Sequence, residues 1–350
     1  WGIFPSVALG WNLSNEEFWT NHIGENFGAK LRVSWGISGN NNIGNYEHVG
    51  YMSNLGGYVL GGQIVPTRYP SAFVDNLLGW EKTDQYNVGM DLSFLRNRLT
   101  LSANYYNSIS NDLLFNKPIS AIAGATQYKS NLSNAKIRNT GFDIQVDGRI
   151  LTGPVTWNVG ANLSLNRNKV LSLPDSQSIV SIGERSAISH ITMVGKPIGS
   201  FYGLNSLGVI SEEEYQRILV DKQHIGEEGY QLTGPAVWNY ENVQPGDAKW
   251  KDVNNDGKIT DDDREILGDN YPDFTYGFST NISYKGVSLS ASFSGVQGAQ
   301  VISFQNYYLL NMEGTCNQFA LAADRYNSVT NPDPAMYRAN IATTNKNTYG

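Results

Sequence analysis

The sequence predicts an all-β fold, namely an antiparallel transmembrane β-barrel segment of about eight strands with long extracellular loops. Three observations predict this fold. Apolar and polar residues alternate through eight segments, the polar positions carry few charges, and the connectors are alternately very short and very long. A period of two indicates strands, because successive side chains of a strand leave opposite faces of the sheet.

The first two segments show the weakest alternation. Their apolar positions are Val7, Leu9 and Trp11, and then Leu31, Val33, Trp35 and Ile37. The linker between them, from Asn12 to Ala29, is long, and its length does not follow from the pattern.

Three hairpins follow along the chain. The first joins residues 85–95 to 99–105 through Arg96-Asn97-Arg98, and the third joins residues 274–284 to 287–294 through Lys285-Gly286. The second leads from the alternating residues 142–147 to 155–165 and turns at Thr152-Gly153-Pro154. Two strands connected this tightly form a hairpin. The connectors between hairpins are tens of residues long, and outer-membrane barrels have short periplasmic turns and long external loops. We therefore expect the turns at Asn97, Gly153 and Gly286 on the periplasmic side.

Alternation alone also fits a soluble antiparallel sheet with one wet face. The segment 155–165 has eleven residues, whereas a soluble strand has about five or six and a tilted membrane strand about nine to eleven. The polar positions are mostly Asn, Ser, Thr, Gln and Gly, which suit a water-filled lumen. Aromatic residues near strand ends fit an interfacial girdle, although cross-strand packing would also use them; they are Trp11, Trp80, Tyr105, Trp157 and Tyr284.

Composition excludes several classes of protein. The 350 residues contain no run of about twenty apolar residues, so helical membrane spans are not expected. The net charge of −7 argues against nucleic acid as a partner. The four histidines are scattered and no nucleophile motif is present, so we do not expect an enzyme.

Several short motifs resemble the SusC/RagA-type TonB-dependent transporters of Bacteroidetes outer membranes. As a set, and in this order along nearly the whole chain, they are specific, although each is weak alone. They are GIFPS at 2–6 with WNLS at 11–14, KLRVSWGISGNNN at 30–42, WEKT at 80–83, VGKPIGSFYG at 194–203, PGD at 245–247 leading into Asp252, Asp263-Arg264, and YPDFTYG at 271–277.

The resemblance implies a 22-stranded barrel with an N-terminal plug, a SusD-like lipoprotein lid and transport powered by TonB. Eight strands are readable, but neither end of the sequence reads as closing a barrel, and an open edge in hydrocarbon would leave backbone groups unpaired. We therefore expect residues 1–350 to be part of one barrel domain whose plug and terminal strands lie outside this segment. Residues 172–270 are expected to be a long extracellular loop insertion.

The resemblance also implies the location and the function. The protein would lie in the lipid of a Gram-negative, Bacteroidetes-like outer membrane and import an oligosaccharide, another glycan fragment or a peptide. The alternative is a soluble, secreted β-rich carbohydrate-binding module. A glycan-active enzyme is a third and weaker interpretation, which requires two carboxylates at hydrolytic spacing in one cleft.

One segment of the long connector matches a calcium-binding loop. Its candidate ligands are Asp252, Asn254, Asp256, the backbone carbonyl of Lys258, and Asp263, with Gly257 permitting the sharp turn. Calcium needs hard oxygen ligands from several directions, and this spacing wraps them around one point. A loop rich in Asx-turns that binds no metal would have the same residues. We predict a structural Ca²⁺ if the loop binds one.

The external loops also carry aromatic residues that could stack on sugar rings. The candidates for substrate contact are Trp238, Tyr240, Trp250, Tyr307 and Tyr308. Aromatic residues in long loops more often pack the loop against itself. The same connector contains a helix signal, because Ser211 and Glu214 have the spacing of a capping box.

Overall fold

The structure, a computed structural model, divides the chain into two compact units. It describes residues 2–24, 26–44, 52–70, 73, 75, 77–120, 122, 127–174, 178–182, 189–227, 229–310, 312, 317–332, 334 and 336–340. Unit 1 comprises residues 1–178, 193–198 and 271–299, and unit 2 comprises residues 179–192, 199–270 and 300–350. Part of the loop insertion expected at 172–270 therefore folds together with residues beyond 300.

Unit 1 is built around one antiparallel sheet of eight strands, as the alternation predicts. Its order is β1-β2-β5-β6-β7-β8-β15-β16, so β1 and β16 are the two edges. The strands are β1 (Ser6–Asn12), β2 (Phe27–Asn40), β5 (Glu81–Phe94), β6 (Leu99–Pro118), β7 (Gln127–Thr152), β8 (Val155–Ser172), β15 (Phe274–Tyr284) and β16 (Val287–Gln297).

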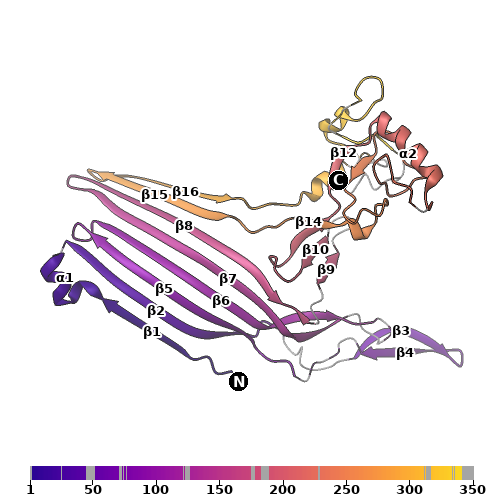
Figure 1. The fold of residues 1–350 in the computed structure, drawn as a ribbon. Coiled ribbons are helices and arrows are strands. Elements are labelled where there is room, and N and C mark those ends of the chain that lie inside the picture. Colours follow the sequence, from indigo (N-terminus) through magenta and orange to yellow (C-terminus); the bar gives the residue numbers. More distant parts are fainter. Residues whose placement is uncertain are drawn as a thin grey trace. The chain divides into compact units, whose positions relative to one another are not determined.

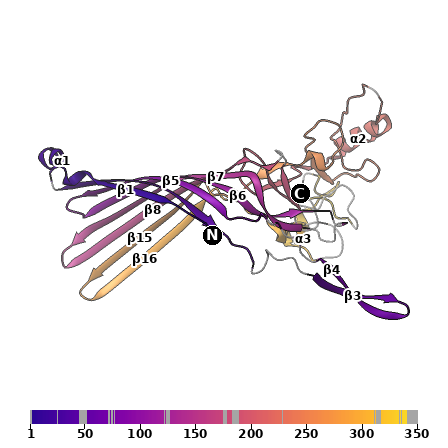
Figure 2. The same cartoon turned by 90° about the horizontal axis from the view of Figure 1, so that it is seen from below.

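The three predicted tight turns lie at one end of this sheet, and the long connectors leave from the other end (Figure 1). At β15–β16 the turn uses Lys285 and Gly286, whose φ angles of 46° and 85° are both positive. A two-residue turn with positive φ at both positions matches the twist of the flanking strands. Figure 2 shows the same end from below, with the helix of the β1–β2 connection beside it.

The long linker between β1 and β2 is folded. It contains the 3₁₀ turn η1 (Leu13–Asn15) and the helix α1 (Glu17–His22). The Trp19 ring stacks on Phe27 with 5.3 Å between ring centroids, and its Nε1–H donates to the Phe27 carbonyl over 2.9 Å. These contacts fix the linker against the start of β2. The β1–β2 connection is therefore ordered, although it is longer than the three tight turns.

Strands β6 and β7 extend far beyond the segments that the sequence predicts. Their pairing shifts register between Asn111 and Leu113, and Asp112 and Asn134 have positive φ angles of 55° and 66°. A bulge of this kind inserts a residue and interrupts the alternation. A separate hairpin of unit 1 joins β3 (Met52–Leu60) to β4 (Gln63–Pro70).

Unit 2 has short strands around its own hydrophobic core. One sheet has the order β14-β11-β10-β9, and β12 pairs with β13. The elements are β9 (Ile179–Ile182), β10 (Ser189–Thr192), β11 (Ser200–Gly203), β12 (Ser206–Val209), α2 (Glu212–His224), β13 (Ala248–Trp250), η5 (Asp261–Asp263), β14 (Glu265–Gly268), α3 (Phe304–Leu309) and η6 (Ala320–Asp324).

Helix α2 begins with the capping box that the sequence predicts. The Ser211 Oγ accepts from the Glu214 N–H, and the Glu214 carboxylate accepts from the Ser211 N–H. Asp221, near the other end of α2, is fully buried and accepts from the backbone N–H groups of Thr233 and Gly234. The helix is thereby joined to the turn that follows it. Within the described residues, no helix is long and apolar enough to cross a membrane.

A segment near the end of the described chain completes unit 2. The Arg338 Nε donates to the buried Asp247 carboxylate over 2.5 Å, and the Arg338 N–H donates to the Gly246 carbonyl over 2.8 Å. The hydroxyls of Tyr337 and Ser206 lie 2.7 Å apart. Residues 336–340 are thus fixed to a part of the chain about ninety residues earlier, on the other side of the β15–β16 hairpin in sequence.

Candidate functional site on the two faces of the sheet

One face of the eight-stranded sheet exposes an apolar band. Leu9, Val33, Val88 and Leu289 are 74%, 52%, 50% and 71% exposed, respectively. They come from β1, β2, β5 and β16, so the band extends from one edge of the sheet to the other. A contiguous apolar surface of this extent requires a non-aqueous partner.

Tryptophan side chains lie toward both ends of this band. The Trp35 Nε1–H donates to the Asp84 carboxylate over 2.7 Å near the loop end, and the Trp11 Nε1–H donates to Glu16 over 2.8 Å near the turn end. From Asp84 to Phe94 the strand rises roughly 33 Å, which a tilt of about 40° reduces to about 25 Å. This height agrees with the apolar band of outer-membrane barrels, about 25 Å.

The opposite face carries a charged network across β2, β5 and β6. Arg32 makes two hydrogen bonds to Asp91, from Nε over 2.7 Å and from Nη2 over 2.8 Å. Its Nη2 also donates to the Asn104 Oδ1 over 2.8 Å, and the Ser102 Oγ donates to Asp91 over 2.8 Å. The two hydrogen bonds between guanidinium and carboxylate hold both side chains in a fixed geometry. These residues were not among the predicted site residues, although charged residues on a polar strand face are a signal that the sequence contains.

Another part of the polar face, on β8, β15 and β16, has a different character. The alternation places only Asn, Ser, Thr and Gly on this face between Thr156 and Asn168, between Thr275 and Ser283, and between Ser288 and Ser294. The Asn281 Nδ2 donates to the Ser290 Oγ over 2.7 Å, and the Ser283 and Ser288 hydroxyls lie 2.8 Å apart. This region offers amide and hydroxyl groups and no charge.

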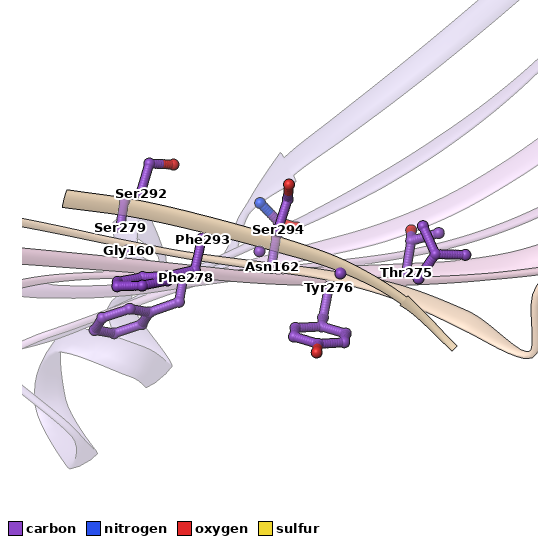
Figure 3. A pocket seen from close by; sticks show the side chains of 12 residues that line it. Gly160, Asn162, Thr275, Tyr276, Phe278, Ser279, Ser292, Phe293 and Ser294 are labelled. Atoms are coloured by element: carbon purple, nitrogen blue, oxygen red, sulfur yellow. The ribbon is translucent and has the colours of Figure 1, made fainter. Parts of the chain in front are cut away.

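Figure 3 shows how β15 and β16 separate the two kinds of side chain. Tyr276 and Phe278 point to one side of the sheet, whereas Ser292 and Ser294 point to the other. The Phe278 and Phe293 rings lie 6.4 Å apart on the apolar side. Next to them, Tyr276 lies over Gly295, where a side chain would clash with the ring. A hollow of about 590 Å³ is lined by residues of these strands and of β8.

The predicted calcium loop is well ordered by its own hydrogen bonds. The Asp252 carboxylate accepts from the Asn255 and Gly257 N–H groups, and the Asn254 side chain accepts from the Asp256 N–H. Further along, the Asp256 carboxylate accepts from the Lys258 N–H over 2.8 Å.

The acid at the last position of this loop, Asp263, is buried. Its carboxylate accepts from the Val253 and Thr260 N–H groups, which close the loop. No group of three or more His, Cys, Asp or Glu side chains among the described residues is placed to hold a metal ion. Calcium binding therefore stays a prediction from the spacing of Asp252, Asn254, Asp256, Lys258 and Asp263.

The structure corrects one predicted substrate contact. Trp250 is 2% exposed and lies in a core cluster with Leu204, Ala236, Ala248 and Ile259. A sugar ring cannot reach a side chain in this position, so Trp250 is a core residue. Trp238 packs partly against the same cluster.

The other candidate aromatic residues are partly buried. The Tyr240 hydroxyl donates to the Gly257 carbonyl over 2.8 Å, and burial, with nearby Asp221, raises the pKa of Tyr240 to about 12. Tyr307 and Tyr308 lie on α3 with their rings edge to face. The role of these three residues and of Trp238 in substrate contact stays a prediction.

Comparison with known proteins identifies the family. The family described as "TonB dependent receptor-like, beta-barrel" matches residues 1–200. The chain belongs to this family. Its predicted similarity to SusC/RagA-type TonB-dependent transporters is confirmed, and the predicted location in the outer membrane is confirmed with it.

Named relatives cover most of this chain. It is 30% identical over 328 residues to TonB-dependent receptor P3 of Formosa agariphila, covering 91% of the chain and 30% of that receptor. It is 29% identical to TonB-dependent receptor SusC of Bacteroides thetaiotaomicron, covering 83% of the chain and 27% of SusC. The chain thus spans less than a third of the length of either relative.

Solved structures show the same fold. The structure of the RagAB peptide transporter matches with a TM-score of 0.74 and 21% identity, over 97% of this chain and 34% of that one. The 'closed-closed' state of the RagAB peptide importer matches with a TM-score of 0.73 and 22% identity. The family, and not the soluble module, therefore accounts for the apolar band.

Proposed function

We propose that this chain forms part of the wall of an outer-membrane importer that takes up an oligosaccharide or another glycan fragment, or a peptide. The observation that carries the proposal is the separation of the two faces of the sheet. One face exposes Leu9, Val33, Val88 and Leu289, and the other carries only polar groups on β8, β15 and β16. Such a sheet separates hydrocarbon from a water-filled passage.

The uncharged part of the polar face favours a neutral substrate. Asn281, Ser283, Ser288 and Ser290 offer donors and acceptors without a fixed charge. A neutral, hydroxyl-rich molecule can exchange hydrogen bonds with such groups without the desolvation of an ion. This favours an oligosaccharide. The likeness to the RagAB peptide transporter, at 21% identity, keeps a peptide as the second candidate.

We propose the partners from the family. The complete protein would couple to TonB through a plug outside this segment, and a SusD-like lipoprotein would cover its external mouth. The network of Arg32, Asp91 and Asn104 faces the same side as the polar groups of the passage, so it would hold β2, β5 and β6 in register beside that passage.

The test uses cells in which the full-length protein is the only importer of its kind. Uptake of labelled neutral oligosaccharides and of labelled peptides is measured with and without a protonophore, which removes the energy for TonB. We expect energy-dependent uptake of oligosaccharides. Uptake of peptides without uptake of oligosaccharides would show that the substrate is a peptide. Absence of uptake for both classes, with the protein present in the outer membrane, would overturn import.

A further inference from the structure

The hairpin ends of the sheet carry positive charge. Arg96 and Arg98 lie in the β5–β6 turn and Lys285 lies in the β15–β16 turn, whereas Arg149 lies in the last part of β7, before the β7–β8 turn. Residues 95–98, 148–155 and 284–287 contain no acid. All four cations are exposed. Because β5–β6, β7–β8 and β15–β16 follow one another in the sheet, the turns form one row, which we call the basic row.

Two arginines of the basic row bind uncharged groups. Arg98 donates to the carbonyls of Arg149 and Ile150, at 3.3 Å and 2.8 Å, and thereby joins the first turn to the second. Arg96 donates to the Asn26 side chain over 3.3 Å. Among the described residues, none of the four cations forms an ion pair with a carboxylate. Their charge is therefore available to an anion from outside.

The basic row borders the apolar band. The Lys285 Nζ lies 5.2 Å from the centre of the Tyr284 ring, and Tyr284 is 47% exposed on the apolar face. Ile150, Leu151 and Ile282 are 41%, 46% and 39% exposed beside it. Cations at the end of an apolar surface are the arrangement that a phospholipid requires, with its phosphate at the cations and its acyl chains on the apolar side chains.

We propose that the basic row binds the phosphate groups of anionic phospholipids in the periplasmic leaflet of the outer membrane. The inference rests on the outer-membrane location and on the periplasmic position of the short turns. It goes beyond the proposed import function, because it identifies a class of lipid that binds preferentially to the barrel. Arg98 and Lys285 contact the phosphates directly, and Arg149, which pairs with Asn158 on the polar face, adds charge from that face.

Other parts of unit 1 lack this property. The β1–β2 connection carries Glu16 and Glu17. At the opposite end of the sheet, charges of both signs occur together, as in Glu81, Lys82 and Asp84, or are paired, as in Arg167 with Asp273. Selection for an anion is therefore expected at the basic row and not at the loop end.

The experiment compares lipid retention by three forms of the full-length protein. Each form is reconstituted with equal amounts of phosphatidylcholine and phosphatidylglycerol, and the retained lipids are counted by native mass spectrometry. The test variant is R98Q/R149Q/K285Q. The control, K82Q/K136Q/K169Q, removes the same charge from the opposite end of the sheet. Mobility in gels before and after heating shows that each barrel is folded.

We expect the wild type and the control to retain phosphatidylglycerol in preference to phosphatidylcholine. The test variant should lose this preference by about fivefold per cation removed, since each basic residue near an anionic surface contributes about 1 kcal/mol. A variant with R98K, R149K and K285R should keep the preference. Equal lipid retention by wild type and test variant, or an equal loss in the control, would overturn the proposal.

Uptake measurements on the same forms separate this proposal from import. Lipid preference without uptake by the wild type would remove the proposed function and leave the lipid site standing. If the wild type takes up substrate but no form of the protein prefers phosphatidylglycerol, the lipid site is overturned and the proposed import function stands.

Discussion

The two units of this chain use hydrophobic side chains in opposite ways. In unit 1, Leu9 and Leu289 are 74% and 71% exposed on a sheet whose other face is polar. In unit 2, Ile210 and Trp250 are 0% and 2% exposed, inside clusters enclosed by polar loops. One polypeptide therefore contains one unit that exposes its apolar side chains and another unit that buries them. Unit 1 places its apolar groups against lipid, and unit 2 hides them from water.

The largest effect is expected from emptying the core of unit 2. Trp250→Ala removes a fully buried ring and leaves a cavity, which should lower the free energy of unfolding of unit 2 by about 3–5 kcal/mol. Thermal unfolding of the full-length protein, followed by hydrogen exchange of residues 199–270, measures this. Trp11→Ala is the matched variant, because that ring is 51% exposed. An equal loss of unfolding free energy in both variants would show that the two units do not differ in how they use hydrophobic side chains.

A charge on the apolar face should have the next largest effect. Phe278→Arg places a cation in the band and should lower the stability of the barrel in lipid by about 2–4 kcal/mol. Ser279→Arg adds the same charge to the neighbouring residue on the polar face, where water can solvate it. Urea unfolding in lipid vesicles distinguishes the two. If both variants unfold alike, the assignment of the faces is wrong.

Acid should destabilise unit 2 by protonating two hydrogen-bonded carboxylates, those of Asp221 and Glu265. Burial raises the pKa of Asp221, but hydrogen bonds from the Thr233 and Gly234 backbone outweigh this and hold the pKa below its ordinary value of 3.8. Hydrogen bonds from Lys251 and Asn205 likewise lower the pKa of Glu265 below 4.5. A lowered folded-state pKa adds stability above the unfolded-state pKa, and this stability is lost as the pH falls through the folded-state value.

The melting temperature of unit 2 should therefore fall as the pH is lowered below about 4.5. Calorimetry of the wild type and of Asp221→Asn measures this, and the variant should show a weaker dependence on acid. A melting temperature that rises with acid would show that these carboxylates do not stabilise the unit.

The smallest effect is expected at the start of α2. Ser211→Ala removes the oxygen that accepts from the Glu214 N–H, which should destabilise the helix by about 1 kcal/mol. Faster hydrogen exchange in residues 212–224 would report it. Ser211→Asp keeps an acceptor and should exchange like the wild type; a variant with alanine that also does so would show that the cap is dispensable.

The sequence predicts the sheet well because one face of each strand must be apolar throughout. The three tight turns and the strands beside them follow from that rule. The ends of β6 and β7 do not, because the irregularity around Asp112 breaks the alternation that reveals a strand. Helix α1, with six residues, is too short to show a period.

The candidate site was predictable only in part. The sequence showed which strand faces are polar, but not that Arg32 joins Asp91, Ser102 and Asn104 across three strands. Trp250 was mistaken for a substrate contact because an aromatic residue in a loop looks the same whether it is exposed or buried. Its burial depends on residues such as Leu204 and Ile259, which the linear sequence does not bring together.

The ion pair between Arg338 and Asp247 joins two parts of unit 2 that the β15–β16 hairpin of unit 1 separates in the sequence. A polypeptide that stopped after Gln297 would contain all eight strands of the sheet, yet Asp247 would lack Arg338 and unit 2 could not reach its final packing. The packing of unit 2 thus depends on residues that follow the last strand of unit 1 in the sequence.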